Sequence, residues 1–352
     1  MILSSLNLTN FRCYKDFKID FAPITIFSGP NGIGKTNLIE GVYLLSLGKS
    51  YRTNDNLELI RWQEDFCRIK GNVKNDVLEL IIDKNSLQKI VKINEVKKKN
   101  IELFGKLKTV LFSPETADIV TGAPRLRRRF LDVILSQINR EYLCNLIDLQ
   151  KVIRNRNALL KNIKEKRSTP EELNFWNSKL IELSKPIIKE RLKLINYIDG
   201  SINPLFSYFK INKGNLKIKY VQSISDLDYF PDLLFKNQER EIAFSSTMFG
   251  PHRDDLRFLL DNRDLSQFAS RGEIRAVVFS LKMAELNYLK QKDESTLLLL
   301  DDIFSELDKI RREKLSEIIK DQPTIITTTD EELIGKELRK KAKIVKLDQL
   351  AD

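Results

Sequence analysis

The sequence predicts an α/β fold with an antiparallel β subdomain and a second, mainly helical lobe. Three observations predict it. A glycine-rich loop at residues 29–36 lies between a short apolar strand and an apolar helix. A run of four leucines ends in two aspartates at 301 and 302, which is typical of a buried parallel strand. From Pro124 onward the apolar residues recur at helical spacing, which indicates a second lobe.

The first part of the chain is rich in short β segments separated by polar turns. Residues 6–11 and 17–21 predict a pair of strands. A second group of strands is expected to form an antiparallel meander beside the glycine-rich loop, and it covers residues 67–73, 77–82 and 90–93. One more buried strand, over 110–112, is stopped by Ser113-Pro114.

The segment after Pro124 predicts two helices that form a short antiparallel hairpin. The first runs from Pro124 to about residue 162, and a charged connector follows. The second starts at Pro170 and runs to about residue 198, with a break near Pro186 because proline disrupts helical hydrogen bonding. The stretch 124–200 is too short for a long coiled-coil arm.

The α/β character returns near the end of the chain. From residue 249 the sequence predicts a helix over 274–290, the leucine strand, and a last strand over 324–328. We therefore expect one lobe from residues 1–122 and 240–352, and a helical lobe from residues 123–239.

The glycine-rich loop fits the pattern G-x-x-x-x-G-K-[ST] with the residues Gly29, Pro30, Asn31, Gly32, Ile33, Gly34, Lys35 and Thr36. A strand over 24–27 and a helix over 37–47 flank it, which is the context that this motif needs. Glycines let the backbone turn tightly and aim its N–H groups at phosphate oxygens. Lys35 is expected to reach the β- and γ-phosphates and Thr36 to bind Mg²⁺. The loop thus predicts ATP and Mg²⁺ as cofactors.

The two aspartates predict the other half of the same site. Asp301, at the carboxyl end of its strand, is expected to hold Mg²⁺ directly or through water. Asp302 is placed to orient the attacking water. Many ATPases of this architecture have glutamate there, and aspartate is one methylene shorter, so we hypothesise slow hydrolysis.

Ser270 and Gly272 precede the helix over 274–290. A serine and a glycine at a helix start make a second anion cradle. One subunit already has a phosphate loop, so we expect this cradle to be used in trans, against the γ-phosphate held by a second copy. The alternative is an ordinary helix cap.

The charge balance favours a polyanionic partner. Lys and Arg number 60 against 49 Asp and Glu, a formal net charge of +11, and such an excess suits nucleic acid or an anionic membrane surface. The three cysteines are far apart and predict neither a metal site nor a disulfide framework. No apolar run approaches the roughly 20 residues that span a bilayer. We expect a cytoplasmic protein without a signal peptide or membrane partner.

Two basic clusters are candidates for DNA contact. Arg127, Arg128 and Arg129 crowd the start of the first hairpin helix, where arginine opposes the helix dipole. Lys49 and Arg52 flank an aromatic ring just after the nucleotide helix and are expected to contact a nucleic-acid backbone. For the arginine cluster the alternative is a set of salt bridges between the lobes.

Several further segments accompany the loop. They are residues 10–12 (Asn-Phe-Arg), 48–53 (Gly-Lys-Ser-Tyr-Arg-Thr), 111–115 (Leu-Phe-Ser-Pro-Glu), 127–132 (Arg-Arg-Arg-Phe-Leu-Asp), 250–255 (Gly-Pro-His-Arg-Asp-Asp), 270–273 (Ser-Arg-Gly-Glu) and 300–308 (Leu-Asp-Asp-Ile-Phe-Ser-Glu-Leu-Asp). Together they resemble the RecF family of bacterial DNA replication and repair proteins, within the SMC-like, ABC-type ATPase superfamily. The resemblance is nearly full length, and segments 127–132 and 250–255 are its most specific parts.

The resemblance implies an ABC-type P-loop ATPase head and a set of activities. These are ATP-dependent homodimerisation, binding to single-stranded and gapped double-stranded DNA, and a weak DNA-stimulated ATPase that acts as a molecular switch. It also implies cooperation with RecR and RecO in loading recombinase, and a role in replication-fork maintenance and the SOS response.

The resemblance also implies roles for single residues. Ser270 is the signature serine, Glu115 lies in the segment that contacts Mg²⁺ or water, and Asp308 belongs to the loop that senses the opposing subunit. Glu273 stands where a glutamine is common, and a carboxylate there is expected to weaken the ATP-bound dimer or speed its release.

Other functions fit parts of the sequence. A transporter-type nucleotide-binding subunit is disfavoured because residues 327–330 (Thr-Thr-Thr-Asp) hold no counterpart of the usual switch histidine. A DNA scaffold that binds ATP without turnover remains an alternative, and Asp302 is the residue that tests it. A small-molecule P-loop kinase would leave the segment around Ser270 without a purpose.

Overall fold

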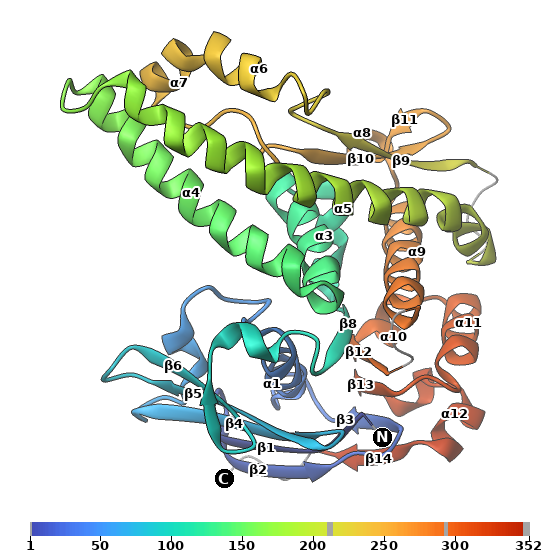
Figure 1. The fold of residues 1–352 in the computed structure, drawn as a ribbon. Coiled ribbons are helices and arrows are strands. Elements are labelled where there is room, and N and C mark those ends of the chain that lie inside the picture. The colour runs from blue at the N-terminus through green and yellow to red at the C-terminus, as the bar shows by residue number, and fades with distance from the viewer. Residues whose placement is uncertain (1, 210–213, 292–294, 348–352) are drawn as a thin grey trace. The chain divides into compact units, whose positions relative to one another are not determined.

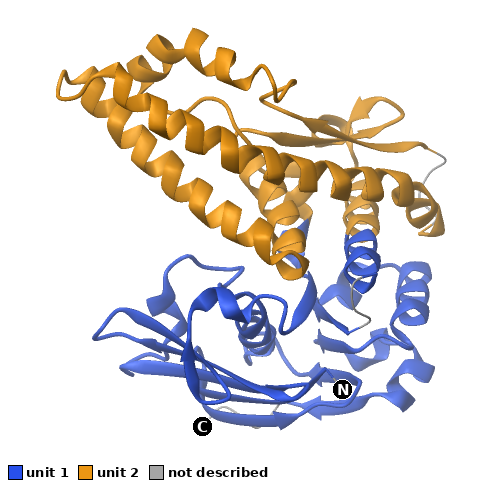
Figure 2. Ribbon diagram, viewed as in Figure 1, with its two compact units in different colours: residues 1–116, 282–352 blue, residues 117–281 orange. Residues whose placement is uncertain are grey.

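The computed structural model describes residues 2–209, 214–291 and 295–347. The chain divides into two compact units, residues 1–116 with 282–352 (unit 1) and residues 117–281 (unit 2), as Figure 2 shows. The sequence placed the lobe boundaries at 122 and 240, whereas the units divide at 116 and 281. The difference arises because strands within residues 240–281 pair with a strand of unit 2.

Unit 1 contains a six-stranded antiparallel sheet (Figure 1). Its strands, in sheet order, are β2 (Tyr14–Asp20), β1 (Leu3–Phe11), β4 (Phe66–Val73), β5 (Asp76–Asp83), β6 (Gln88–Ile93) and β7 (Val96–Lys98). The expected antiparallel β subdomain is confirmed. The strand pair β1–β2 and the meander join in one sheet because β1 pairs with β4 along its length.

The second sheet of unit 1 is parallel and has five strands. Their order is β14 (Lys343–Lys346), β3 (Ile24–Ser28), β13 (Thr324–Thr328), β12 (Thr296–Asp301) and β8 (Lys108–Phe112). Every residue of β3, β13, β12 and β8 is buried, as expected for a parallel sheet covered on both faces. The expectation that β13 is the last strand was wrong, because the short, lysine-flanked β14 pairs with β3 at the sheet edge.

Helix α1 (Lys35–Leu47) forms the core of unit 1. It contacts β8, β12 and β13 of the parallel sheet and β1, β4 and β5 of the antiparallel sheet. Eleven of its thirteen residues are buried, in keeping with a helix that is apolar on all sides. Gly48 ends the helix in the left-handed conformation, with its N–H bonded to the Leu44 carbonyl at 2.8 Å.

Short helices complete unit 1. They are η1 (Asn56–Leu59), η2 (Asn100–Leu103), η3 (Pro114–Ala117), α10 (Ile303–Glu306), α11 (Lys309–Ile319), η5 (Glu331–Leu333) and α12 (Lys336–Lys341). Asp308 caps α11 by accepting from the Arg311 N–H at 2.9 Å.

Unit 2 begins with α2 (Asp118–Thr121), α3 (Pro124–Ile138) and α4 (Arg140–Lys164). The expected single helix from Pro124 to about 162 is therefore two helices. Asn139 separates them, because its backbone is extended and its side chain accepts from the Tyr142 N–H at 3.0 Å. Asparagine is a favoured residue at this capping position.

The long helix α5 (Leu173–Tyr208) follows the 3-10 turn η4 (Pro170–Glu172) and lies along α4 as an antiparallel hairpin (Figure 1). The expected break near Pro186 is wrong, since α5 continues through both Pro186 and Pro204. A continuous buried stripe on α5, which includes Ile187, Ile195 and Phe206, offsets the hydrogen bonds that the prolines remove.

The rest of unit 2 combines a small sheet with further helices. The sheet has the order β11 (Arg263–Asp264), β10 (Asp255–Leu260), β9 (Leu216–Val221) and is antiparallel. The helices are α6 (Phe230–Lys236), α7 (Gln238–Phe244), α8 (Leu265–Phe268) and α9 (Arg271–Lys290), the last of which crosses the unit boundary. Within the described residues, no helix has the length and apolar character that a bilayer span requires.

Candidate nucleotide site

The glycine-rich loop connects β3 to α1 in unit 1. Positive φ angles occur at Gly32 (87°) and Gly34 (109°), not at Gly29. A Cβ at position 34 would lie 2.5 Å from the Cys13 sulfur and 3.0 Å from the Tyr14 hydroxyl. Gly34 is thus required both by its backbone conformation and by the close approach of the β1–β2 turn.

Lys35 and Thr36 stand at the start of α1, where the loop ends. The Lys35 ammonium donates to the carbonyls of Gly29 at 2.6 Å and Pro30 at 2.7 Å. Burial lowers the pKa of Lys35, while the nearby carboxylates of Asp302 and Asp301 act to raise it. The lysine therefore lies folded across its own loop, within the electrostatic influence of both aspartates.

Asp301 ends β12 and is the centre of a hydrogen-bond network. Its Oδ1 accepts from the hydroxyls of Thr36 at 3.0 Å and Thr327 at 2.8 Å, and its Oδ2 accepts from Tyr51 at 3.2 Å. Burial raises the pKa of Asp301, these three hydrogen bonds lower it, and the charge of Glu115 raises it. Thr36 and Asp301 thus meet across 265 positions of sequence.

Asp302 follows β12 in the left-handed conformation, with φ of 52°. Its N–H donates to the carbonyl and the hydroxyl of Thr327 at 3.2 and 3.1 Å. Its side-chain Oδ1 is buried and has no hydrogen-bond partner among the described residues. A buried carboxylate oxygen without a donor is costly, so this atom fits a ligand or a water molecule at the site.

The oxygen atoms of Thr36 and Asp301 fit a magnesium ion that is bound together with a nucleotide. No cluster of three or more His, Cys, Asp or Glu side chains suited to a metal occurs in the described ranges. A magnesium ion next to Thr36 and Asp301 would thus take its other ligands from phosphate oxygens and water, as this ion usually does. Glu115 is exposed in η3, and its charge acts on Asp301, which places it near the same carboxylate.

The segment 48–53 is joined to this site, which sequence reasoning missed. Tyr51, the aromatic residue between Lys49 and Arg52, directs its hydroxyl to Asp301. Ser50 and Arg52 both donate to the fully buried Glu40 of α1, and Arg12 binds the same carboxylate with two bonds of 2.9 Å. Lys49 is exposed. Arg12 belongs to the segment 10–12, but no sequence pattern indicated that Glu40 would be its partner.

Ser270 precedes α9 in unit 2 and takes part in a capping box. Its hydroxyl and its N–H both donate to one carboxylate oxygen of Glu273 at 2.8 Å, and the Glu273 N–H donates back at 3.3 Å. A Cβ at Gly272 would have no neighbour nearer than the Ser270 hydroxyl at 4.0 Å. The helix cap considered as an alternative is present, and the use of Ser270 and Gly272 in trans stays a prediction.

The arginine cluster of α3 has partners within unit 2. Arg127 is buried and binds both carboxylate oxygens of Asp255, at 2.6 and 2.9 Å, and the Gly122 carbonyl at 2.6 Å. Arg128 donates to the Asp254 carbonyl at 2.7 Å. This intramolecular ion pair occupies the Arg127 guanidinium and argues against a DNA contact by this residue, which stays a prediction. Contact of Arg128 or Arg129 with DNA stays a prediction.

Two further arginines, both buried, form ion pairs within unit 2. Arg156 bonds Glu241 at 2.5 Å and Arg191 bonds Asp132 at 2.7 Å. Arg191 also donates to the carbonyl of Pro251, in the specific segment 250–255, at 2.6 Å. That segment therefore has a structural role in unit 2.

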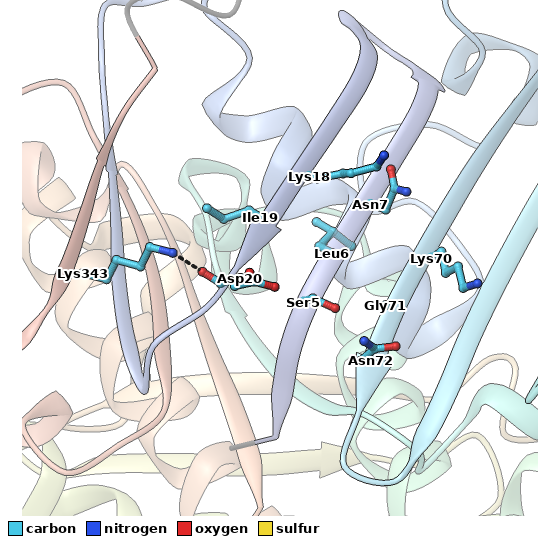
Figure 3. A pocket seen from close by; sticks show the side chains of 10 residues that line it. All are labelled: Ser5, Leu6, Asn7, Lys18, Ile19, Asp20, Lys70, Gly71, Asn72 and Lys343. Carbon is cyan, nitrogen blue, oxygen red and sulfur yellow. Dashed lines mark hydrogen bonds between the residues drawn. The ribbon is translucent and has the colours of Figure 1, made fainter.

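A separate polar cavity of about 560 Å³ lies on the antiparallel sheet of unit 1. Figure 3 shows its lining, which comes from β1, β2, β4 and β14: Ser5, Leu6, Asn7, Lys18, Ile19, Asp20, Lys70, Gly71, Asn72 and Lys343. Lys343 donates to the Asp20 carbonyl at 2.6 Å. None of the residues placed at the nucleotide site lines this cavity.

Comparisons with known proteins agree with the geometry. The RecF/RecN/SMC N-terminal domain family matches residues 2–350. The DNA replication and repair protein RecF of Clostridium perfringens is 37% identical over 99% of this chain and 98% of its own length. The chain belongs to the RecF family.

Solved structures support the assignment to the RecF family. A structure of the recombination mediator protein RecF with ATP, from the RecFOR pathway, has a TM-score of 0.88, 30% identity, and coverage of 94% of this chain and 92% of that one. An Smc head domain of Pyrococcus furiosus, at a TM-score of 0.55 and 14% identity over 98% and 93% of the two chains, shares the fold. The expected ABC-type ATPase head is thereby confirmed.

Proposed function

We propose that this RecF-family chain is an ATP-gated DNA clamp. Its loop residues bind the phosphates of ATP, Lys35 leaves the loop carbonyls to reach the β- and γ-phosphates, and the Thr36 hydroxyl, which donates to Asp301, would offer its oxygen to the metal. Magnesium bound there would neutralise phosphate charge. Asp301 fixes the metal position and Asp302 orients the attacking water.

The observation that carries this proposal is the convergence of four side chains at one edge of the parallel sheet. Thr36 bonds Asp301, both carboxylates act on the Lys35 ammonium, and Asp302 keeps a buried oxygen without a partner. An anionic ligand that carries a cation would supply the missing partners: the anion would pair with Lys35, and the cation or its water would contact the carboxylates.

ATP is proposed to join two copies of the chain. Ser270 and Gly272 of one subunit would contact the γ-phosphate held by the loop of the other, so that two ATP molecules lie between two subunits. For this contact the Ser270 hydroxyl must leave Glu273, to which it is bonded in the capping box. We therefore expect Glu273 to oppose closure of the dimer, and Asp308 to sense the opposing subunit.

The partners are proposed from charge and family. The formal net charge of +11 suits DNA, and the relatives are DNA replication and repair proteins. We propose that the closed dimer binds single-stranded and gapped double-stranded DNA in the cytoplasm, hydrolyses ATP slowly with stimulation by DNA, and helps RecO and RecR to load recombinase. Lys49, Arg52, Arg128 and Arg129 are the candidate phosphate contacts.

Fluorescence anisotropy of a labelled gapped duplex tests the proposal. Affinity is compared in Mg-ATP and Mg-ADP at fixed salt, because phosphate contacts depend strongly on ionic strength. Tighter binding in Mg-ATP that is lost in Lys35→Ala supports the clamp. Equal affinity with both nucleotides, or no binding, would contradict it.

A DNA scaffold that binds ATP without turnover is the second candidate, because the aspartate at position 302 is short for a water-orienting group. Asp302→Asn keeps the shape and removes the charge. The clamp predicts that DNA release after ATP chase slows in this variant, whereas an unchanged release rate would favour the scaffold.

A further inference from the structure

Tyr51 links the nucleotide site to the segment that carries Lys49 and Arg52, and nothing in the proposed chemistry uses it. Its hydroxyl lies 3.2 Å from Asp301 Oδ2. Its ring packs edge-on against Tyr43 of α1, with centroids 5.3 Å apart and an interplanar angle of 78°. The ring is thereby held in place by packing, and the hydroxyl is aimed by that packing.

The phenol is a dependable hydrogen-bond donor. A tyrosine hydroxyl is protonated near neutral pH, and that of Tyr51 donates to Asp301. Among the described residues, Tyr51 is the donor to Oδ2, while Thr36 and Thr327 serve Oδ1.

The residues on either side of Tyr51 are tied to α1. Ser50 and Arg52 donate to Glu40, at 2.5 and 3.3 Å, and Glu40 is fully buried. The segment is also fixed at its start, where Gly48 closes α1. Arg52 also donates to Asn37 of α1 at 2.9 Å. Segment 48–53 is therefore attached to α1 through Gly48, Glu40 and Asn37, and to β12 through one hydroxyl.

The outward-facing groups of the segment are cations. Lys49 is exposed, and the Arg52 side chain is 36% exposed. Tyr51 stands between these two cations in the chain, so its hydrogen bond to Asp301 connects their segment to that carboxylate.

We propose that Tyr51 is a positioning residue that holds the Asp301 carboxylate turned toward Thr36 and connects the nucleotide site to Lys49 and Arg52. This inference rests on the proposed function. The Thr36 hydroxyl can donate to Asp301 and offer its oxygen to a cation at the same time, so a cation bound at Thr36 would also attract the Asp301 carboxylate. Any resulting shift of the carboxylate is carried by the Tyr51 hydroxyl to the segment.

Tyr51→Phe removes this hydroxyl and keeps the ring. Tyr43→Phe is the matched control, since it removes a hydroxyl from the neighbouring ring and leaves the contact to Asp301. Binding of a fluorescent ATP analogue is measured in EDTA and in Mg²⁺, and gapped-duplex affinity is measured in Mg-ATP and Mg-ADP. The analogue measurement reports on Mg²⁺ binding beside Asp301, and the DNA measurement reports on the link from Asp301 to Lys49 and Arg52.

We expect Tyr51→Phe to reduce the gain in analogue affinity that Mg²⁺ provides by about tenfold, the scale of a hydrogen bond to a charged group. Affinity in EDTA should stay within about twofold, because the phosphate loop itself is unchanged. The preference of DNA binding for Mg-ATP over Mg-ADP should shrink. Tyr43→Phe should match the wild type in both measurements.

Other outcomes overturn the inference. An unchanged Mg²⁺ gain, or an equal loss of affinity with and without Mg²⁺, would show that Tyr51 only supports packing. If Tyr51→Phe does not fold, Tyr51→Met fills a similar space without a hydroxyl and gives the same test. Failure of the wild type to bind DNA would instead contradict the proposed function, while the Mg²⁺ measurement would still decide the role of Tyr51.

Discussion

The nucleotide site of unit 1 and the arginine cluster of unit 2 are both built from charged side chains in family motifs, yet they differ in how completely those charges are paired. In unit 2, Arg127 of this cluster binds a carboxylate, and so do Arg156 of α4 and Arg191 of α5. In unit 1, Lys35 is held by two loop carbonyls, and Asp302 keeps a buried oxygen that no described residue serves.

This difference separates structural charges from functional ones. A buried ion pair needs no ligand, and removal of one partner leaves an uncompensated charge. A site with an unserved acceptor and a lysine resting on backbone carbonyls is completed only when something binds. Motif specificity alone did not distinguish structural from ligand-binding charges, since the most specific segments, 127–132 and 250–255, supply the paired residues Arg127, Asp132 and Asp255.

The largest expected effect is the loss of stability when a buried ion pair of unit 2 is broken. Arg156→Met should lower the free energy of unfolding by about 3–5 kcal/mol, because Glu241 is left buried and unpaired. Trp176 fluorescence during urea unfolding, in a Trp62→Phe background, reports on unit 2. Lys151→Met, which breaks an exposed pair with Asp148, should change stability by less than about 1 kcal/mol. If Arg156→Met lost nucleotide affinity but kept its stability, the distinction between the two sites would be wrong.

The converse effect is expected in unit 1. Lys35→Ala should weaken binding of a fluorescent ATP analogue by about 100-fold, in line with charge-assisted hydrogen bonds to phosphate of 1.5–3 kcal/mol. Stability should change little, because Lys35 is paired only with loop carbonyls. Lys97→Ala, an exposed lysine of β7, is the control. A large drop in stability in Lys35→Ala would mean that this lysine is structural as well.

A comparison within the α3 cluster sharpens the distinction. Arg127→Gln should destabilise unit 2 by about 2 kcal/mol, because the bidentate contact to Asp255 is lost. The dependence of DNA affinity on salt should stay unchanged in this variant. A contact to phosphate by Arg129 predicts that Arg129→Gln lowers the salt slope by about 1. If Arg127→Gln lowered the salt dependence of DNA affinity, Arg127 would contact DNA despite its ion pair with Asp255.

The smallest expected effect concerns pH. Burial lowers the pKa of His252 from 6.5 to about 4, and the charges of Arg253, Arg128 and Arg156 act in the same direction, against a hydrogen bond to the Thr247 carbonyl. Protons therefore bind the unfolded chain first, so this contribution to stability is complete above pH 6.5 and is lost as the pH falls toward 4. From pH 7 to 5.5 the loss should be about 1 kcal/mol.

Urea unfolding at these two pH values measures the effect, with His252→Gln as the comparison. The difference between the two stabilities should shrink by that amount in the variant. The same pH dependence in both proteins would show that other groups of unit 2 cause it.

The sequence by itself determined the elements of the nucleotide site. The loop at 29–36, its flanking strand and helix, and the leucine strand with Asp301 at its end all rest on local rules: glycine conformations, apolar runs and the position of a polar residue at a strand end. The antiparallel subdomain was predictable for the same reason, since alternation and turn residues act over a few positions.

Only the tertiary structure decided which charges were paired. Glu40 meets Arg12 and Arg52, Tyr51 reaches Asp301 across 250 positions, and Arg127 finds Asp255 across 128. The continuity of α5 through Pro186 and the division of the units at 281 also depended on packing between distant segments. The physical reason is that local sequence sets backbone preference, whereas the partner of a buried polar group is whichever distant side chain the fold brings within hydrogen-bond distance.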